Sequence, residues 1–314
     1  MTHRTIAKVI VNPVAGTGSS IRHWPHIKSE LEKLGILYEA VFTERPSHAI
    51  ELAREAATLH YRYIVAVGGD GTINEVVNGI LAAEFAGLDK GEPVTRISLG
   101  VINTGTGSDF VRSLGIPRDP DRACHHLLSD KRLMVDVGVI EWTHNGNANR
   151  RYFVNAAGVG FDAEAADARR KLPKFFRGPI SYLIGVGSTL FGYRNKPITK
   201  KLDEADETLS RSLSVIVANG CYFGGGMKVA PDALLGDQLF DVLTIGDIGK
   251  FELMQAFPRV YKGTHTTHPK VRVERAATVN LSSVEKLLLQ ADGEIIGEGS
   301  FRFSLLPGAL SVII

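Results

Sequence analysis

Two glycine-rich segments carry acidic side chains where a strand gives way to a helix. In the first, an apolar run from Tyr63 to Val67 is followed by Gly68-Gly69-Asp70-Gly71-Thr72. Glycines let the backbone approach a ligand closely, and the free N–H groups at the start of a helix bind phosphate. The segment therefore predicts a phosphate site, where Asp70 is a candidate for binding Mg²⁺ or a ligand hydroxyl. The alternative is a tight turn whose aspartate caps its own backbone.

The helix after this turn is expected to begin at Thr72. Glu75 follows three residues later. A threonine and a glutamate at this spacing are typical of a capping box, in which each side chain bonds to the backbone N–H of the other.

The second segment, from Leu99 to Arg112, repeats the order of strand, small-residue loop and helix start. Its loop contains Gly105-Thr106-Gly107, and Asp109 lies in the first helical turn. No Lys-Ser/Thr pair follows these glycines, which excludes a Walker A loop. Two such loops at one sheet edge are suited to holding a polyphosphate.

A third acidic turn, Asp292-Gly293, separates two strand-like runs near the C-terminus. Asp-Gly is a favoured turn in β-hairpins, so a purely structural role is the first explanation.

The composition is that of an ordinary globular protein. The 314 residues are 44% hydrophobic and 22% charged, which is enough chain for two domains. The formal net charge of +2 gives no indication of a nucleic-acid partner. Cys124 and Cys221 form neither a disulfide framework nor a zinc motif, which fits a reducing cytoplasm. No signal peptide is expected, and the apolar stretch Ile180 to Phe191 is shorter than the roughly 20 residues that span a bilayer.

The pattern of strands and helices changes near Asp136. Strands and helices alternate before it, which predicts a parallel sheet covered by helices, with ligands at the C-terminal ends of the strands. Asn12, Thr43, Gly68 to Thr72 and the Gly105 loop would gather at that edge. Strand follows strand after it, which predicts an antiparallel sandwich or partial barrel. We expect an α/β domain over residues 1–136 and a β-rich domain over residues 137–306.

The motifs resemble those of a known enzyme family. Gly-Gly-Asp-Gly-Thr occurs in diacylglycerol, sphingosine and NAD kinases and, in a variant form, in phosphofructokinases. Its continuation Ile73-Asn74-Glu75, together with Gln-Ala-Asp-Gly-Glu at 290–294, resembles the diacylglycerol and sphingosine kinase catalytic domain of the bacterial soluble lipid-kinase type. The resemblance implies an N-terminal α/β domain similar to NAD kinase and phosphofructokinase, a mostly antiparallel β-sandwich, and a last strand, 307–314, that returns to the first domain.

The resemblance also implies an activity and its residues. ATP would donate its γ-phosphate to a lipid hydroxyl, on diacylglycerol or a related lipid. Asp292 would be the general base, and Glu294 would help position metal and phosphate, with Mg²⁺ near Asp70 and Glu294. The residues expected to bind ATP are Asn12, Pro13, Gly16, Thr43, Gly68, Gly69, Asp70, Gly71, Thr72, Glu75, Gly105 and Thr106.

A structural Mg²⁺ site is implied as well. The segment Pro231 to Val242 resembles the family segment whose first aspartate, here Asp237, binds this ion. The implied metal-binding residues are Asp237, Leu234, Leu239, Asp109 and Asp136. The chain departs from the family pattern in two places. In the second glycine segment, Asn103 and Thr104 replace the usual Pro and Leu, and Ser108 replaces the usual Asn. In the metal segment, Gln238 replaces the usual Gly.

Several alternatives stay open at this point. An NAD kinase shares the first motif, and a lipid- or nucleotide-binding protein without turnover would tolerate the departures. The basic and aromatic segment Arg169 to Arg177 is either a solvated helix end or a contact with anionic lipid at a membrane surface. A second copy of the chain is a further candidate partner. We expect a cytoplasmic protein, with peripheral contact at the inner membrane face as the variant.

Overall fold

The computed structural model describes residues 6–59, 61–89, 97–144, 146–171, 187–190 and 192–314. The chain divides into two compact units. Unit 1 contains residues 1–135 and 308–314, and unit 2 contains residues 136–307. The nucleotide-binding and lipid-binding roles expected for two such domains stay predictions.

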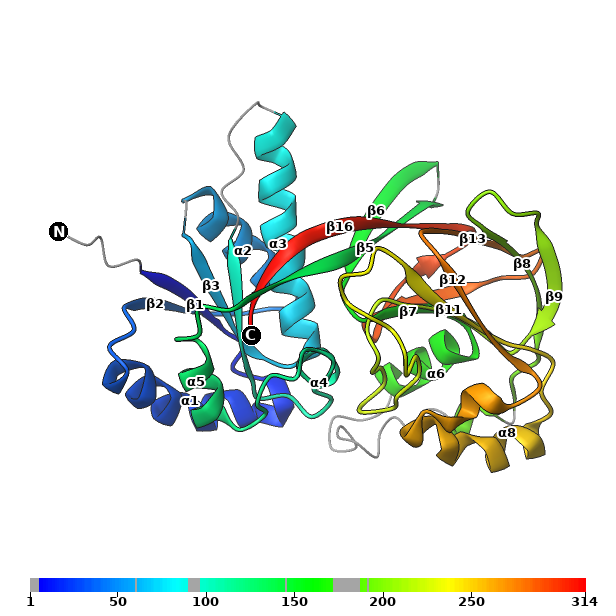
Figure 1. Cartoon of the computed structure of the whole chain (residues 1–314), viewed down its shortest axis with the longest axis horizontal. Coiled ribbons are helices and arrows are strands. Elements are labelled where there is room, and N and C mark those ends of the chain that lie inside the picture. The colour runs from blue at the N-terminus through cyan, green and yellow to red at the C-terminus, as the bar shows by residue number, and fades with distance from the viewer. Residues whose placement is uncertain (1–5, 60, 90–96, 145, 172–186, 191) are drawn as a thin grey trace. The chain divides into compact units, whose positions relative to one another are not determined.

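Unit 1 is a parallel sheet covered by helices, as the alternating pattern predicted (Figure 1). Its strands lie in the order β2-β1-β3-β4-β16, and every neighbouring pair is parallel. The elements are β1 (Ala7–Val11), α1 (Ala15–Lys33), β2 (Tyr38–Phe42), α2 (His48–Thr58), β3 (Tyr63–Gly68), α3 (Asp70–Asp89), β4 (Ser98–Asn103), α4 (Asp109–Leu114), α5 (Pro120–His126) and the end of β16 (Phe301–Ile313).

The core of unit 1 explains why these segments form strands. Val9, Val11 and Val67 are fully buried, and Ile27 and Leu31 of α1 pack against them. A short, continuous apolar run buried on both faces is typical of a strand in a parallel sheet. The sheet in turn places the ends of β1, β3 and β4 at one edge.

Small residues bring α2 and α3 close together. Ala49, Ala53 and Ala56 form the buried face of α2, and Gly79 lies on α3. A Cβ atom at Gly79 would overlap the carbonyl oxygen of Ile50 and the Cβ of Ala53. This close contact fixes α3 against its neighbour.

Unit 2 is a sandwich of antiparallel strands (Figure 1). One sheet has the order β12-β11-β10-β7-β14-β15 and is antiparallel throughout. The other contains the antiparallel pairs β5–β6, β8–β9, β8–β13 and β13–β16. The strands are β5 (Arg132–His144), β6 (Asn147–Phe153), β7 (Ala156–Gly160), β8 (Lys196–Leu202), β9 (Thr208–Ser212), β10 (Ser214–Ala218), β11 (Phe240–Ile245), β12 (Val271–Ala276), β13 (Thr278–Ser282), β14 (Leu288–Ala291) and β15 (Glu294–Glu298), and the helices are α6 (Phe161–Lys171), α8 (Lys250–Ala256), η2 (Phe257–Lys262) and η3 (Thr264–Thr267).

Aromatic side chains from both sheets fill the sandwich. Phe153 of β6 stacks on Phe240 of β11 with ring centroids 5.6 Å apart. Phe303 of β16 meets Phe153 edge to face at 6.4 Å. All three are fully buried. Such pairs contribute about 0.5–1.5 kcal/mol each beyond the area they bury. The predicted fold class, an α/β part followed by an antiparallel sandwich, is confirmed.

The strand β16 contributes to both units. Its first residues pair antiparallel with β13, where Phe301 lies opposite Leu281. Its last residues pair parallel with β4, where Ser311 lies opposite Ser98 and Val312 opposite Leu99.

In the described part of the chain, no helix combines the length and apolar character needed to cross a membrane.

Candidate active site

In the turn between β3 and α3, Gly68 packs against the side chain of Thr72. The helix α3 begins at Asp70, and the N–H of Ile73 donates to the carbonyl of Gly69 at 3.0 Å. The expected helix start at Thr72 is therefore wrong, because Thr72 already lies in the first turn. Thr72 is buried, and its hydroxyl accepts from the amide of Asn12 at 2.9 Å. A Cβ atom at Gly68 would overlap that hydroxyl, so this position requires glycine.

The two glycine loops pack backbone against backbone. A Cβ atom at Gly69 would lie 3.2 Å from the Cα of Gly105, and one at Gly105 would overlap the Cα of Gly69. Asp70 also links the two segments, because its Oδ1 accepts the N–H of Phe110 in α4 at 3.0 Å. The turns that the sequence predicted at one sheet edge do lie together there.

The residues of the second loop that depart from the family pattern form hydrogen bonds with polar side chains. The amide of Asn103 donates to the hydroxyl of Ser108 at 2.7 Å, and the Thr104 hydroxyl bonds to that of Ser20. Ser108 has a φ of 59°, the left-handed region, and is fully buried. Asn103 and Ser108 thus replace the usual family residues with a hydrogen-bonded pair that holds the loop.

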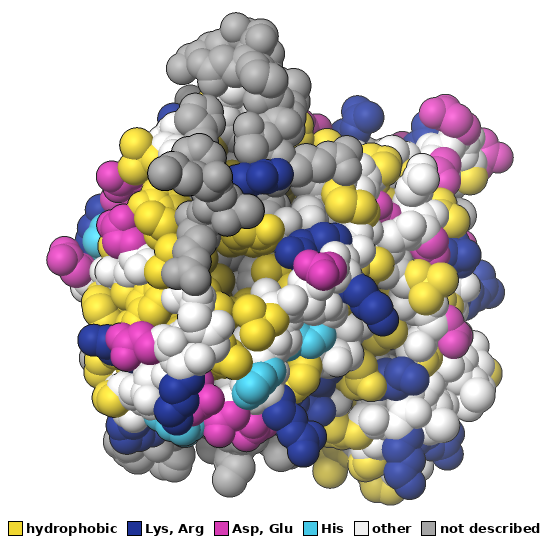
Figure 2. Space-filling view, turned by 60° about the vertical axis from the view of Figure 1, so that its left-hand side comes forward, with side chains coloured by type: hydrophobic (Ala, Val, Ile, Leu, Met, Phe, Trp, Pro, Cys, Tyr) yellow, Lys and Arg dark blue, Asp and Glu magenta, His cyan; other side chains and the backbone are white. Residues whose placement is uncertain are grey.

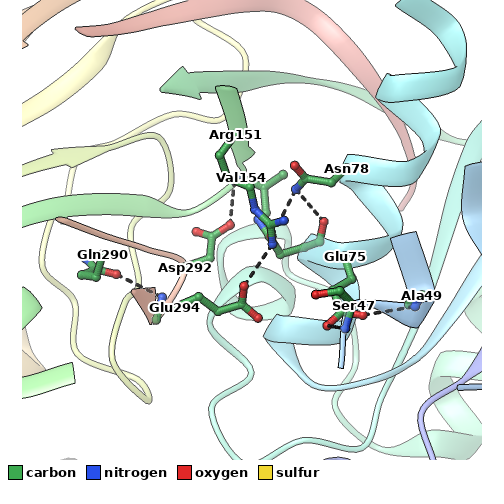
Figure 3. A network of polar contacts seen from close by, with 11 residues as sticks. Ser47, Ala49, Glu75, Asn78, Arg151, Val154, Gln290, Asp292 and Glu294 are labelled. Carbon is green, nitrogen blue, oxygen red and sulfur yellow. Dashed lines mark hydrogen bonds and ion pairs between the residues drawn. The ribbon is translucent and has the colours of Figure 1, made fainter. Parts of the chain in front are cut away.

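Glu75 has a different structural role from the one expected. Its two carboxylate oxygens accept the N–H groups of Ser47 and Ala49 at 3.0 and 3.2 Å (Figure 3). Ser47 is the N-cap of α2 but makes no side-chain cap bond. The predicted capping box at the start of α3 is wrong, because Glu75 caps α2 instead. A carboxylate at a helix N-terminus also interacts favourably with the helix dipole.

The other residues expected to bind nucleotide lie at the same edge of unit 1. Asn12 and Pro13 follow β1, Thr43 follows β2, and Thr106 lies in the loop after β4. Gly16 has a φ of 59°, and a Cβ there would overlap the carbonyl oxygen of Thr104. Gly71 lies in the first turn of α3. Their positions agree with the sequence analysis, and their contact with a nucleotide stays a prediction.

In unit 2, the Asp292 turn is both a hairpin and a carboxylate site. Asp292 and Gly293 connect β14 to β15 with φ values of 45° and 84°, as a tight Asp-Gly hairpin requires. The Asp292 carboxylate accepts three successive backbone N–H groups, those of Val154, Asn155 and Ala156, at 2.9, 2.9 and 3.1 Å. Figure 3 shows this carboxylate directed at the segment that contains Val154. The structural explanation of Asp-Gly and the fixed carboxylate are therefore compatible.

Glu294 has a partner that sequence reasoning missed. Its Oε2 accepts from the guanidinium of Arg151 in β6 at 3.0 Å (Figure 3). The Arg151 side chain is 19% exposed and that of Glu294 is 42% exposed. No local signal in the sequence indicates this pair, because 143 positions separate the two residues.

Two of the expected metal ligands meet at one turn. The Asp136 carboxylate accepts the N–H of Gln238 at 2.6 Å, and Asp237 accepts the N–H of Leu239 at 3.2 Å and pairs with Arg275. Gln238 has a φ of 66°, the region that favours the glycine usual in the family. Asp109 lies in the first turn of α4, in unit 1.

The donor set fits Mg²⁺ in part. Carboxylate and carbonyl oxygens are the ligands this ion prefers. Within the described ranges, however, no three His, Cys, Asp or Glu side chains converge as a metal site. The guanidinium of Arg275 also occupies one oxygen of Asp237. A site here would depend on main-chain oxygens such as those of Leu234 and Leu239, and it stays a prediction.

Charges of both signs are mixed on the face that Figure 2 shows. Figure 2 shows a face where Lys and Arg side chains lie among Asp, Glu and hydrophobic ones, so neither sign of charge dominates it. In the basic segment, Arg170 and Lys171 both pair with Asp167 of α6. Residues 172–177 of that segment lie outside the described ranges.

Known proteins match both units. Residues 7–140 match the diacylglycerol kinase catalytic domain, and residues 155–314 match the YegS C-terminal NAD kinase beta sandwich-like domain. A diacylglycerol kinase from Staphylococcus haemolyticus (strain JCSC1435) is 32% identical, over 98% of this chain and 88% of its own. One from Staphylococcus aureus (strain bovine RF122 / ET3-1) is 33% identical, over 98% and 92%.

A solved structure agrees with the fold. The crystal structure of a diacylglycerol kinase from Bacillus anthracis str. Sterne has a TM-score of 0.72 at 20% identity, over 100% of this chain and 98% of that one. The sequence matches extend over nearly the whole chain, and the two family models match its two units in turn. The chain therefore belongs to the diacylglycerol kinase family of lipid kinases, phosphotransferases with an alcohol group as acceptor.

Proposed function

We propose that this protein transfers the γ-phosphate of ATP to the hydroxyl of a membrane lipid, with diacylglycerol as the first candidate. The observation that carries the proposal is the Asp292 carboxylate, which three backbone N–H groups hold in one orientation within the family's Gln-Ala-Asp-Gly-Glu segment. Phosphoryl transfer needs an oriented hydroxyl, a proton acceptor and neutralised phosphates. A fixed carboxylate suits the second of these roles.

The glycine loops of unit 1 are the proposed seat of the ATP phosphates. The helix α3 has 20 residues and begins at Asp70, so its N-terminal N–H groups and positive dipole end lie at the first loop. Gly69 and Gly105 leave no side chain between the two loops. Phosphate oxygens would accept hydrogen bonds from backbone N–H groups there.

Asp292 is the proposed general base. As the lipid oxygen bonds to the γ-phosphorus and the bond to ADP breaks, the Asp292 carboxylate accepts the hydroxyl proton. Such a base typically contributes 10²–10⁴ in rate. Asp70 and Glu294 are the proposed residues that would hold Mg²⁺ through carboxylate oxygens, and the ion would neutralise phosphate charge.

A panel of acceptors tests the reaction. The protein is incubated with γ-labelled Mg-ATP and mixed micelles containing diacylglycerol, a sphingoid base, a glycolipid or a polyprenol, with NAD as a soluble acceptor. We expect label in diacylglycerol or in one of the other lipids. Label in NAD, or ATP binding with no labelled product, would contradict the proposal.

A further inference from the structure

A buried carboxylate bonds to the strand that leads into the Asp292 turn. Asp162, near the start of α6, is 5% exposed, and its two oxygens accept from different strands. The hydroxyl of Ser214 in β10 donates to Oδ1 at 3.0 Å, and the amide of Gln290 in β14 donates to Oδ2 at 3.0 Å. Burial raises the pKa of Asp162 to about 6, while the hydrogen bonds from Gln290 and Ser214 favour its ionised form.

The sequence makes room for this carboxylate. Gly158 of β7 lies opposite Gln290 in the sheet. A Cβ atom at Gly158 would overlap Oδ2 of Asp162, so any other residue there would displace the carboxylate. The place beside Gln290 is therefore shaped for Asp162.

Gln290 connects Asp162 to the turn through two hydrogen bonds. It is fully buried, and its Oε1 accepts the N–H of Gly293 at 3.0 Å. An ionised carboxylate only accepts hydrogen bonds, so the amide of Gln290 must present its NH₂ group to Asp162. Its oxygen must then face Gly293. The charge on Asp162 thereby sets the orientation of the amide that holds the turn.

We propose that Asp162 is a positioning residue for phosphoryl transfer, which through Gln290 fixes the Gly293 N–H and with it the orientation of Asp292. The inference rests on the proposed function of Asp292 as the base. Asp162 contacts Gln290 and Ser214, and it acts on the turn through the first of these. A displacement of about 1 Å at a reacting group lowers the rate by up to about 10²-fold, so the turn is a point where a buried contact controls kcat.

A charge relocation separates this role from simple packing. In Asp162→Asn, the new side chain offers one acceptor and one donor group in place of two acceptors, so it no longer requires Gln290 to present its NH₂ group, and Gln290 loses its fixed orientation. In Gln290→Glu, two carboxylates face each other. In the double variant Asp162→Asn/Gln290→Glu, the amide introduced at position 162 donates to one oxygen of the carboxylate introduced at position 290, and the other oxygen accepts the Gly293 N–H. The chain of hydrogen bonds is restored with the charge moved from one side chain to the other.

The control is a second buried aspartate of unit 2. Asp241 in β11 is 4% exposed, and burial raises its pKa as well. Its Oδ2 has no hydrogen-bond partner among the described residues. Asp241→Asn therefore removes the same charge from the same sandwich without touching Gln290 or the turn.

The experiment measures kcat and KM for lipid phosphorylation and the hydrogen exchange of the Gly293 amide by NMR. We expect Asp162→Asn and Gln290→Glu to lower kcat about 10–100-fold with little change in the KM for ATP. We expect the Gly293 amide to exchange about 10-fold faster in both. The double variant should recover most of the kcat and the protection, and Asp241→Asn should match the wild type.

Two results would overturn the proposal. One is a folded double variant that stays as slow, and as unprotected at Gly293, as Asp162→Asn. The other is an Asp241→Asn variant with the same loss of kcat and protection. If the wild type phosphorylates no lipid, the proposed function fails, while the exchange of the Gly293 amide still shows whether Asp162 controls the turn.

Discussion

Gly105→Ala probes the contact between the two glycine loops. The added methyl carbon would lie 2.4 Å from the Cα of Gly69 and 3.3 Å from its nitrogen. Carbon atoms in ordinary contact lie about 3.5–4.0 Å apart, so one loop must move by about 1 Å. Both nearby atoms belong to the backbone, and no side-chain rotation relieves the overlap.

The expected cost follows from that overlap. Overpacking of a well-packed site typically costs about 1–3 kcal/mol of stability. We also expect ATP to bind about 10-fold more weakly, which is about 1.4 kcal/mol, because the moved loop is a proposed seat of its phosphates. The affinity loss should appear in the Kd for a non-hydrolysable ATP analogue and in the KM for ATP.

The assay is isothermal titration with that analogue, together with thermal unfolding. Gly249→Ala is the matched control, because Gly249 has a φ of −76° and a Cβ there meets nothing within 4 Å. The control should bind the analogue like the wild type. A Gly105→Ala variant with unchanged analogue affinity would show that the contact between the two loops does not control ATP binding.

Three further predictions follow from the polar contacts. Glu75→Gln removes the charge that caps α2 and should lower the free energy of unfolding by about 1 kcal/mol; an unchanged Tm would contradict the capping role. Burial raises the pKa of Asp162 from 3.8 to about 6, so the folded state holds a proton between about pH 4 and 6 that the unfolded chain releases. The contribution of this group to stability is therefore greatest below pH 4 and falls by about 3 kcal/mol as the pH rises through 6. When unfolding is measured at several pH values, the free energy of unfolding of the wild type should rise relative to that of Asp162→Asn as the pH falls from 7 to 5. A constant difference between the two free energies would contradict this prediction. Finally, a double-mutant cycle on Asn103→Ala and Ser108→Ala should give a coupling of about 1 kcal/mol, and additive losses would show that their hydrogen bond contributes nothing.

Local sequence patterns predicted where in the fold the residues of the candidate site lie. The alternation of strands and helices predicted the parallel sheet, and that sheet places residues after β1, β3 and β4 at one edge, as at Asn12 and Gly69. The Asp-Gly pair predicted the hairpin between β14 and β15. These features depend on neighbours in the sequence, so a single chain is enough to find them.

Contacts between distant segments were not predictable in this way. The helix start at Thr72 was placed two residues too late, because Glu75 bonds to the N-terminus of α2 rather than to its own helix. The pairing of Glu294 with Arg151, and that of Asp162 with Gln290, depend on which strands become neighbours and in which register. The glycine at position 158 is the one feature of the sequence connected with this pairing, because the Asp162 carboxylate occupies the space that a side chain at position 158 would need.

A comparison of two aspartates in lipid phosphorylation tests whether Asp292 is the general base. Asp203 has a φ of 46°, and its carboxylate accepts the N–H groups of Ala277 and Thr278 at 3.0 and 2.7 Å, much as the Asp292 carboxylate accepts those of residues 154–156. Asp203→Asn therefore reproduces the structural change without touching the proposed base. We predict that Asp292→Asn lowers the kcat for transfer of γ-phosphate to lipid by about 10²–10⁴, while Asp203→Asn keeps it near the wild-type value. Near-normal turnover in Asp292→Asn, or equal losses in the two variants, would contradict the assignment of Asp292 as the general base.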